Sequence, residues 1–265
     1  MLEFGYIFSP CEFITVKLCQ AIDSCHASDI AIVIPDDATF VAEHGRQPMK
    51  SLEDRMLLAS SIKRVNYVCE IVGEDTFNRI LPVTDEVSSK RFKVGYVPGT
   101  FDLVHPGHLE LVDIARSQCE TVIVGVNSDE QVWKNKQKHP RQNERTRMYI
   151  MQHLRGVDGV ILVETNDKTV ANQKVMNMTG HKIDAIFYGQ DLAGKAINDE
   201  GGLECESIYT PRSEEKMKRV STTAAIKSLD EILRSYKALQ TENEYLKSIL
   251  QQIDWQHPER QRENV

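Results

Sequence analysis

The chain has 265 residues, of which 41% are hydrophobic and 27% are charged, and its formal net charge is −7. This composition is typical of a globular protein with one large or two small domains. The acidic balance argues against non-specific nucleic-acid binding, which usually requires a basic surface, and no apolar run approaches the roughly 18 residues that span a bilayer.

Two further features bear on the compartment. The first four residues lack the basic region that begins a signal peptide. The six cysteines form no C-x-x-C pair and lie mostly in apolar segments, so we expect reduced thiols and a cytoplasmic protein. These cysteines are Cys11, Cys19, Cys25, Cys69, Cys119 and Cys205.

Residues 1–90 are predicted to be a partial, altered copy of the segment that follows. An internal repeat is the simplest interpretation, and a chance likeness between two βα units is the alternative. The matching features recur at an offset of 92 residues: a buried-strand run (30–34 and 122–126), the turn after it (Asp36-Asp37 and Ser128-Asp129) and an Arg-Met pair (Arg55-Met56 and Arg147-Met148).

This first copy is predicted to lack the chemistry of the second. Aligned on Gly5-Tyr6, it places Cys11, Glu12, Phe13 and Ile14 at the positions of a histidine motif at residues 105–108, so both histidines and the glycine are missing. The copy also ends near Val83, before any counterpart of the last strand of the second copy. We interpret it as half a domain that serves packing or regulation.

The histidine motif stands between a predicted strand and a predicted helix. Residues 92–97 read as a buried strand, residues 99–102 as a turn, and apolar residues recur at helical spacing from His108 onward. His105 and His108 therefore lie at a helix start, where free N–H groups and the helix dipole favour an anion, and Gly107 lets a phosphate approach the backbone. This arrangement predicts a nucleotide-phosphate site.

These residues resemble the signature of the nucleotidyltransferase superfamily of the cytidylyltransferase type, a Gly-Thr-Phe-Asp turn followed by His-x-Gly-His. Both elements are complete here, and the resemblance covers roughly residues 92–228. It implies a Rossmann-like fold in which the two histidines are catalytic and bind the triphosphate. It further implies a nucleotide pocket lined by Gly99, Thr100, Phe101 and Gly107.

The remaining pattern of the second copy alternates strands and helices. Strands are predicted at residues 121–127, 159–163, 184–188 and 207–209, and helices at residues 142–154 and 168–179. Such alternation predicts an α/β fold with a doubly wound parallel sheet, whose ligands lie beyond the carboxyl ends of the strands.

Two basic residues follow the strand at residues 121–127. The charged loop at residues 134–138 carries three lysines, and Lys136 best matches the catalytic lysine that the family sets against the α-phosphate; a solvated surface is the alternative. Arg147 matches an arginine of the next helix in the family and is expected to contact phosphate. Its counterpart Arg55 also favours a partly structural use.

Further family matches lie near the end of the second copy. Gly189 and Asp191 resemble a Gly-x-Asp near the nucleotide and acceptor, although a capped turn would look the same. Ser221, Thr222 and Thr223 resemble a Ser-Thr-Thr that can hold the β- and γ-phosphates at a helix N-terminus. Because the spacing before Ser221 is longer than in the family, either Arg212 or Arg219 takes the place of the family's arginine.

The resemblance implies transfer of CMP from CTP to a small phosphorylated alcohol, such as glycerol, choline or ethanolamine phosphate, with release of pyrophosphate. An adenylyltransferase acting on a sugar phosphate such as heptose 1-phosphate or on FMN is one alternative, and a non-catalytic nucleotide sensor is another. No cluster has zinc-ligand spacing, so Mg²⁺ is expected to arrive with the triphosphate.

The last segment is predicted to be a coiled coil. Between Leu229 and Ile253, apolar residues alternate steps of three and four, and Asn243 falls at an a position. This pattern favours a parallel homodimer through residues 229–256; a single amphipathic helix folded against its own domain is the alternative. The predicted division is a partial copy (1–90), a catalytic domain (91–228), the coiled coil (229–256) and a disordered tail (257–265).

Overall fold

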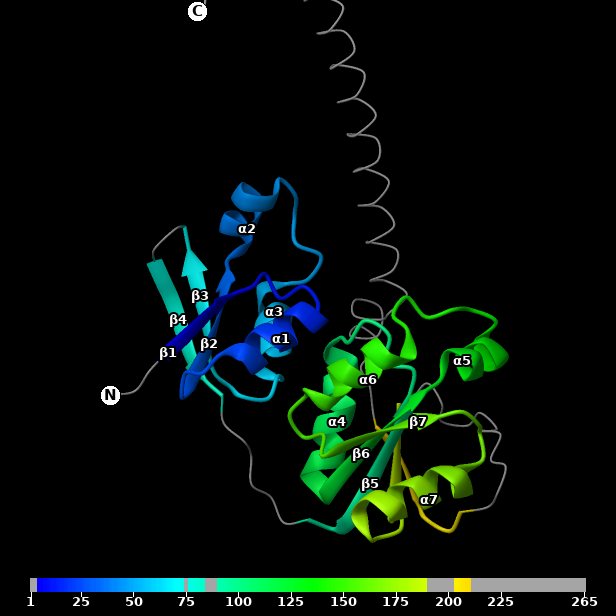
Figure 1. The fold of residues 1–265 in the computed structure, drawn as a ribbon. Coiled ribbons are helices and arrows are strands. Elements are labelled where there is room, and N and C mark those ends of the chain that lie inside the picture. Colours follow the sequence, from blue (N-terminus) through cyan, green and yellow to red (C-terminus); the bar gives the residue numbers. More distant parts are fainter. Residues whose placement is uncertain (1–3, 74–75, 84–89, 190–202, 211–265) are drawn as a thin grey trace, which may run out of the picture. The chain divides into compact units, whose positions relative to one another are not determined.

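The computed structural model describes residues 4–73, 76–83, 90–189 and 203–210. The chain divides into two compact units, residues 1–222 and residues 223–265, and the second lies outside the described residues. The predicted coiled coil and tail therefore lie outside them too. The first unit contains two β-sheets (Figure 1), one in residues 4–83, here called the first part, and one in residues 90–210, here called the second part.

The sheet of the first part has the strand order β1-β2-β3-β4, in which β1 to β3 are parallel and β4 is antiparallel to β3. The sequence analysis did not predict β4, a short strand whose side chains are mostly exposed. The elements of this part are β1 (Phe4–Phe8), α1 (Val16–Ser24), β2 (Asp29–Pro35), α2 (Asp37–His44), α3 (Leu52–Ser60), β3 (Val65–Val72) and β4 (Thr76–Pro82).

The sheet of the second part is entirely parallel, with the order β7-β6-β5-β8-β9. The strand order reverses between β5 and β8, and ligands of such sheets bind beyond the carboxyl ends of the strands at this point. The predicted α/β fold with a parallel sheet is confirmed. The elements are β5 (Phe92–Gly99), α4 (Pro106–Gln118), β6 (Cys119–Asn127), α5 (Asp129–Lys136), α6 (Glu144–Gln152), β7 (Gly159–Val163), α7 (Lys168–Thr179), β8 (Ala185–Gly189) and β9 (Glu206–Thr210).

Short polar side chains fix the starts of comparable helices in both parts. Ser51 accepts a hydrogen bond from the Asp54 N–H at the start of α3, and Asn143 accepts one from the Thr146 N–H at the start of α6. Such N-caps satisfy backbone donors that the helix itself leaves open. Asp36 at α2 and Ser128 at α5 form a second pair of N-caps at the same 92-residue spacing.

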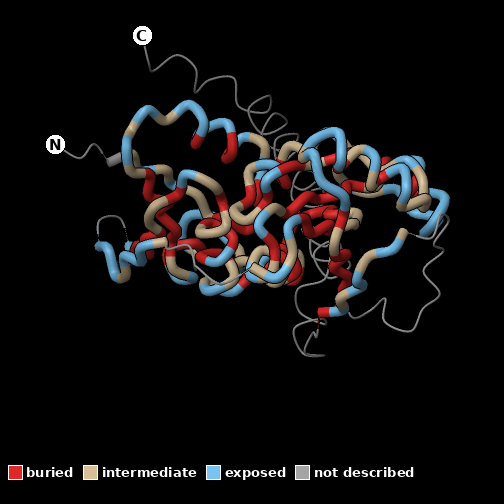
Figure 2. Tube along the Cα trace, turned by 90° about the horizontal axis from the view of Figure 1, so that it is seen from below, coloured by how far each residue is buried: buried red, intermediate tan, exposed pale blue. Residues whose placement is uncertain are grey.

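The hydrophobic core is built on the strands β2, β3, β6 and β8, whose residues are mostly buried. Figure 2 marks the buried residues in red along the trace. One cluster contains Ile32 of the first part, Val124 of the second part, and Ile62 and Leu154 from the two parts. Burying one such side chain contributes about 1.5–3 kcal/mol. All six cysteines are free, and Cys11, Cys19, Cys69 and Cys119 are buried.

A second cluster covers the other face of the sheet of the second part. There Ala171 and Val175 of α7 pack with Tyr96 and Ile161. In the first part β4, rather than a helix, follows β3 along the described chain. Phe8 and Ile80 consequently remain 69% and 59% exposed.

Comparable residues of the two parts meet at a short backbone contact. Ile62 pairs with Leu154 in an isolated antiparallel bridge. The residues on either side exchange reciprocal hydrogen bonds, as across a local two-fold axis. These bonds run from Lys63 N to His153 O (2.8 Å) and from Arg155 N to Ser61 O (2.7 Å).

The structure corrects the predicted alignment of the histidine motif on the first part. The N-cap of α1 is Thr15, that of α4 is His105, and each follows by four residues a position with positive φ, Cys11 or Phe101. Because this turn is retained in both parts, Cys11 corresponds to Phe101. The counterparts of residues 105–108 are therefore residues 15–18, which contain neither histidine nor glycine.

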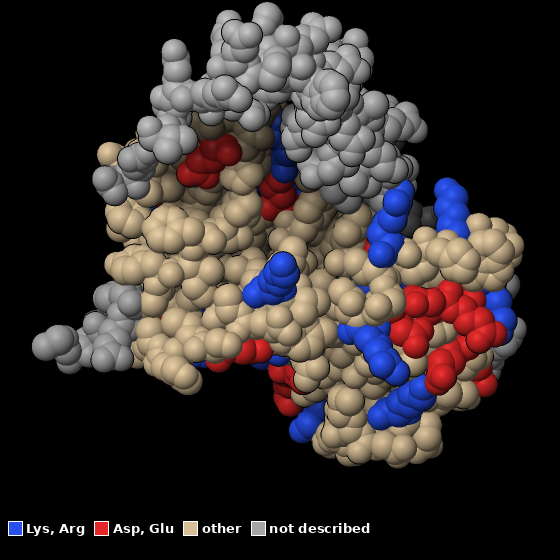
Figure 3. All heavy atoms as spheres, turned by 45° about the horizontal axis from the view of Figure 1, so that its top comes forward, with Lys and Arg blue, Asp and Glu red and all other residues tan. Residues whose placement is uncertain are grey.

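The surface is not dominated by basic groups on the face shown in Figure 3. Lysine and arginine side chains lie scattered there, and several of them adjoin acidic side chains. In the part of the chain that the structure describes, no helix combines the length and apolarity that a membrane crossing demands.

Candidate active site

The turn after β5 has an unusual backbone. Phe101 and Leu103 have φ values of 53° and 51°, a left-handed conformation that costs energy for residues other than glycine. Phe101 is 1% exposed, and a Cβ atom on Gly99 would lie 2.8 Å from its ring. Gly99 therefore allows the ring to pack directly beneath the turn.

Asp102 ties this turn to the segment before α6. Its carboxylate accepts hydrogen bonds from Arg141 N (2.8 Å) and Gln142 N (3.0 Å). In return, the Gln142 side-chain oxygen accepts one from Leu103 N (3.1 Å). The sequence analysis placed Asp102 in the motif but assigned no role to it or to Gln142; the acidic end of the Gly-Thr-Phe-Asp turn was the available signal.

The two histidines of the motif lie together at the start of α4. Their rings stack with centroids 3.8 Å apart and planes inclined by 26°. His105 is the N-cap residue, is 5% exposed and makes no capping hydrogen bond with its side chain. His108 lies in the first turn and meets the Phe101 ring edge-on at 5.2 Å. Both imidazoles thus stand at a helix N-terminus, where the backbone favours negative charge.

Lys136 joins this group from the neighbouring strand-helix unit. The sequence analysis assigned residues 134–138 to a loop, but Lys134 and Lys136 lie in the last turn of α5, where the helix dipole favours cations. The Lys136 ammonium donates to Thr100 Oγ1 at 3.0 Å, whereas Lys134 pairs with Glu130. The structure therefore brings Lys136 to the turn that precedes the histidines.

Arg147 has a different role from the predicted phosphate contact. Its side chain is 0% exposed, because its nitrogens donate to oxygens within the chain. Buried charges of this kind require such partners. The acceptors are Gln142 O (2.9 Å), Thr100 O (2.5 Å), Asn127 O (2.8 Å) and Asp129 Oδ1 (2.6 Å). Arg147 thus joins the motif turn, the end of β6 and the start of α6.

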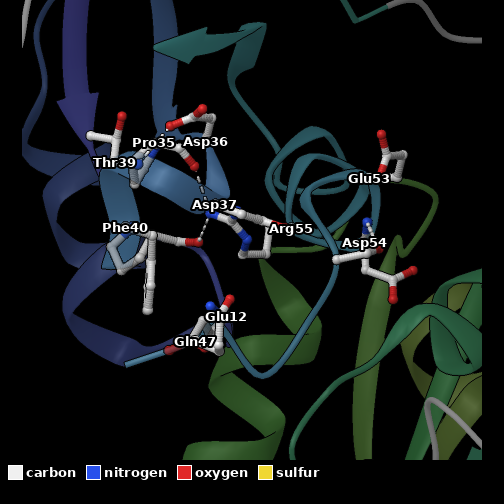
Figure 4. Close-up of polar contacts among 12 residues, drawn as sticks. Glu12, Pro35, Asp36, Asp37, Thr39, Phe40, Gln47, Glu53, Asp54 and Arg55 are labelled. Carbon is white, nitrogen blue, oxygen red and sulfur yellow. Dashed lines mark hydrogen bonds and ion pairs between the residues drawn. The ribbon is translucent and has the colours of Figure 1, made fainter. Parts of the chain in front are cut away.

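Arg55 makes the same kind of contact in the first part (Figure 4). It is also 0% exposed, and it donates to Pro35 O (2.8 Å) and to Asp37 Oδ1 (2.5 Å). Pro35 and Asp37 stand 92 residues before the corresponding acceptors of Arg147. The structural use that the sequence suggested for this pair of arginines is the one observed.

The carboxyl end of β8 borders the same edge of the sheet. Gly189 is buried and pairs with Thr210 of β9. The preceding Tyr188 stacks on Tyr209 with ring centroids 5.5 Å apart, and the Lys168 ammonium lies 5.5 Å from the Tyr188 centroid. Tyr96 of β5 is buried. This burial, followed by the neighbouring Tyr188, raises the pKa of the Tyr96 phenol, which therefore stays neutral.

Several predicted site residues cannot be placed on this framework. Asp191, Arg212, Ser221, Thr222 and Thr223 lie outside the described residues, as does Arg219. Among the residues that are described, no group of three or more His, Cys, Asp or Glu side chains is arranged to hold a metal ion.

Comparison with known proteins identifies relatives that are similar to part of this chain. Bifunctional protein HldE from Hyphomonas neptunium is 40% identical over 75 residues, which are 28% of this chain and 15% of that protein. HldE from Rhodopseudomonas palustris strain HaA2 is 42% identical over 73 residues, 27% of this chain and 15% of that protein. The chain thus spans only a small fraction of the length of the curated relatives it matches.

A solved structure is also similar to part of the chain. The lipopolysaccharide core biosynthesis protein from Thermoplasma volcanium is 22% identical and aligns with a TM-score of 0.39, covering 46% of this chain and 98% of that one.

The family assignment rests on a match over more than half of the chain. The model of the cytidylyltransferase-like family matches residues 96–255, which include the histidine motif, Lys136 and Arg147. The chain belongs to the cytidylyltransferase-like family.

Proposed function

We propose that the chain is a nucleotidyltransferase that transfers CMP from CTP to a small phosphorylated alcohol and releases pyrophosphate. The observation that carries the proposal is the stacked pair His105 and His108 at the N-terminus of α4, with Lys136 hydrogen-bonded to Thr100 beside it. This group stands beyond the carboxyl end of β5, where the strand order reverses. Membership of the cytidylyltransferase-like family supports the same reaction class.

The proposed reaction needs no nucleophile from the protein. A phosphate oxygen of the acceptor attacks the α-phosphorus of the triphosphate, a new P–O bond forms, and the bond to the bridging oxygen breaks as pyrophosphate leaves. Such a transfer depends on in-line positioning and on neutralisation of the charge that develops on oxygen. His105 and His108 would donate to the triphosphate oxygens, and Lys136 would move from Thr100 to the α-phosphate.

We further propose that Mg²⁺ enters with the triphosphate. Two carboxylates of this region are already engaged, Asp102 with two backbone N–H groups and Asp129 with Arg147. These residues therefore fit an ion that is held by phosphate oxygens and water rather than by side-chain ligands. When bound, the ion would neutralise charge on the leaving pyrophosphate.

An adenylyltransferase acting on a sugar phosphate or on FMN is the second candidate. Among the described residues of the site, the cationic or donor groups suit a phosphate rather than a nucleotide base; these residues are His105, His108 and Lys136. They therefore support CTP and ATP equally as the nucleotide.

A substrate panel separates these proposals. We would combine four nucleoside triphosphates with glycerol, choline and ethanolamine phosphates, heptose 1-phosphate and FMN, and measure pyrophosphate release. We expect CTP with one of the phosphorylated alcohols to give the fastest release. Equal or faster release with ATP would replace the cytidylyl assignment by an adenylyl one, whereas binding of CTP without pyrophosphate from any pair would favour a nucleotide sensor.

We also propose that the protein is a homodimer through the heptad pattern of residues 229–256. Burying each leucine or isoleucine of the seam contributes roughly 1.5–3 kcal/mol, and Asn243 favours a parallel pair. Truncation after Ser228, or replacement of Leu239 and Leu246 by Lys, should lower the mass measured by light scattering from dimer towards monomer while pyrophosphate release continues. One unchanged mass for all three proteins would exclude this seam.

A further inference from the structure

The first part keeps the framework of the candidate active site at the carboxyl end of β1. Glu12 occupies the place of Asp102, because its carboxylate accepts a hydrogen bond from Met49 N at 2.5 Å as that of Asp102 accepts one from Arg141 N. Arg46 neutralises the Glu12 carboxylate through two further hydrogen bonds of 2.5 and 3.1 Å. The turn before α1 is thus held to the segment before α3, as the motif turn is held to the segment before α6.

A buried lysine reaches this turn of the first part. Lys50 is 9% exposed and stands 92 residues before Gln142, whose side-chain oxygen accepts a hydrogen bond from the backbone of the turn residue Leu103. The Lys50 ammonium likewise contacts the corresponding turn residue of the first part, Phe13, and lies 5.2 Å from the centre of its ring. Where the second part places an amide oxygen, the first part therefore places a cation.

The Lys50 ammonium makes no hydrogen bond or ion pair within the described residues. An ammonium has three donors, and burying them without acceptors is unfavourable. Desolvation accordingly lowers the pKa of Lys50, although the carboxylates of Asp54 and Glu12, both labelled in Figure 4, act in the opposite direction. An anion beside the ammonium would supply acceptors and favour the charged form of the lysine.

The turn that contains Phe13 leads directly into the N-terminus of α1. The N-cap of this helix is Thr15, whose hydroxyl accepts a hydrogen bond from Leu18 N at 3.2 Å. The N–H groups of Val16 and Lys17, the first two residues of the helix, have no acceptor within it. Lys17 is also exposed, and its ammonium has no ion pair within the described residues. Two N–H groups, the positive end of the helix dipole and a second lysine therefore stand at the turn that the buried ammonium contacts, which suits an anion.

The side chains at the start of α1 favour a smaller anion than a nucleoside triphosphate. Thr15 stands where the second part has His105, and the buried Leu18 stands where it has His108. Both imidazoles that are proposed to hold a triphosphate are thus missing from the first part. The donors that remain suit one tetrahedral anion rather than a chain of three phosphates.

We propose that Lys50 and the N-terminus of α1 form a second anion site, which binds the phosphate group of free phosphate or of a small phosphomonoester. The site lies beyond the carboxyl end of β1, whereas His105 and His108 follow β5, and it does not depend on the proposed function. Because Lys50 immediately precedes Ser51, the N-cap of α3, a bound anion would link the starts of α1 and α3.

Acylation of the lysines in the full-length protein would locate such a site. Acetic anhydride reacts with neutral amines, and mass spectrometry measures the extent of reaction at each lysine separately. We expect inorganic phosphate to half-protect Lys17 and Lys50 at about 1 mM or below, and sodium chloride of equal ionic strength to protect them far less. Glycerol phosphate is the second probe. Protection at a lower concentration than with inorganic phosphate would identify a phosphomonoester as the preferred ligand, and the reverse order would identify free phosphate.

Three variants test the residues of the site. Lys50→Met removes a buried charged donor, so it should raise the phosphate concentration that half-protects Lys17 about tenfold or more. Lys17→Met, at an exposed position, should raise the concentration that half-protects Lys50 about threefold. Lys63→Met is the matched control, because desolvation also lowers the pKa of Lys63. Lys63 precedes β3, at the opposite edge of the parallel strands from the start of α1, so its loss should leave the protection of Lys17 unchanged.

Several outcomes would overturn the proposal. Equal protection by chloride would show charge screening alone, and an equal shift in Lys63→Met would show a general effect of lost positive charge. Half-protection of Lys17 that is unchanged in Lys50→Met would exclude the site. If circular dichroism shows that Lys50→Met does not fold, Lys17→Met decides, and an unchanged half-protection of Lys50 excludes the site. Lys136 is measured in the same spectra, so binding of phosphate in the candidate active site is recognised separately.

Discussion

Replacing His108 by Ala is expected to lower kcat for pyrophosphate release about 100-fold or more while the chain keeps its fold. The imidazole stands at the start of α4 against the rings of His105 and Phe101, where a donor can stabilise charge that develops on phosphate oxygen. Loss of one such preorganised donor usually costs a factor of about 100 to 1,000. The measurements are kcat with the best pair of the substrate panel and the circular dichroism spectrum.

Thr15→Ala is a control at the start of α1, the helix of the first part that corresponds to α4, because Thr15 is the N-cap there as His105 is in α4. Loss of its cap to Leu18 N should cost about 1 kcal/mol of stability and leave kcat unchanged. If His108→Ala loses helical signal together with turnover, the histidine is structural, and the proposed catalytic role fails.

Replacing Arg147 by Met should both destabilise the chain and stop turnover. The substitution leaves the Thr100, Asn127 and Gln142 carbonyls without the donor that now holds them. Such buried unsatisfied groups and a broken ion pair together cost about 3 kcal/mol. Urea denaturation measures the loss of stability. Pyrophosphate release, at a temperature where the variant remains folded, measures the effect on the motif turn.

Arg55→Met separates the two effects. Arg55 is equally buried and holds Pro35 and Asp37 as Arg147 holds Asn127 and Asp129. Its loss should lower stability by a similar amount while kcat of the folded protein stays near that of the wild type. If Arg147→Met is instead as stable as the wild type and mainly raises KM for the triphosphate, the arginine reaches phosphate after all.

The fold of the second part could be predicted where the apolar pattern was strong. Strand β7 (Gly159–Val163) and helix α7 (Lys168–Thr179) have the predicted bounds. Helix α5 was missed because its eight residues have few apolar side chains, and only Gln131 and Val132 are buried. Its available signal was the N-cap Ser128 followed by two acidic residues. Strand β4 was missed because its side chains are mostly exposed, so no buried face marks its pattern.

The candidate site could be predicted in its residue types but not in all of its contacts. The histidines and Lys136 are recognisable by their order along the chain, and the structure brings Lys136 to Thr100. Whether an arginine faces solvent, substrate or the interior depends on which oxygens the fold places around it. Arg147 and Arg55 each had an acidic residue at the same distance earlier in the sequence, Asp129 and Asp37, and that repeated pairing was the signal for an internal clamp.

Because most of the cysteines are buried, the rate at which their thiols react reports how often the chain opens locally. Burial raises the pKa of the Cys11, Cys19 and Cys119 thiols to about 12, and alkylating reagents attack the thiolate rather than the thiol. At neutral pH these three react only in molecules that have locally opened, whereas the half-buried Cys25 is accessible earlier. Because Cys19 lies in α1 and Cys119 begins β6, the rates of alkylation at the two sulfurs record separately how often each part of the protein loosens.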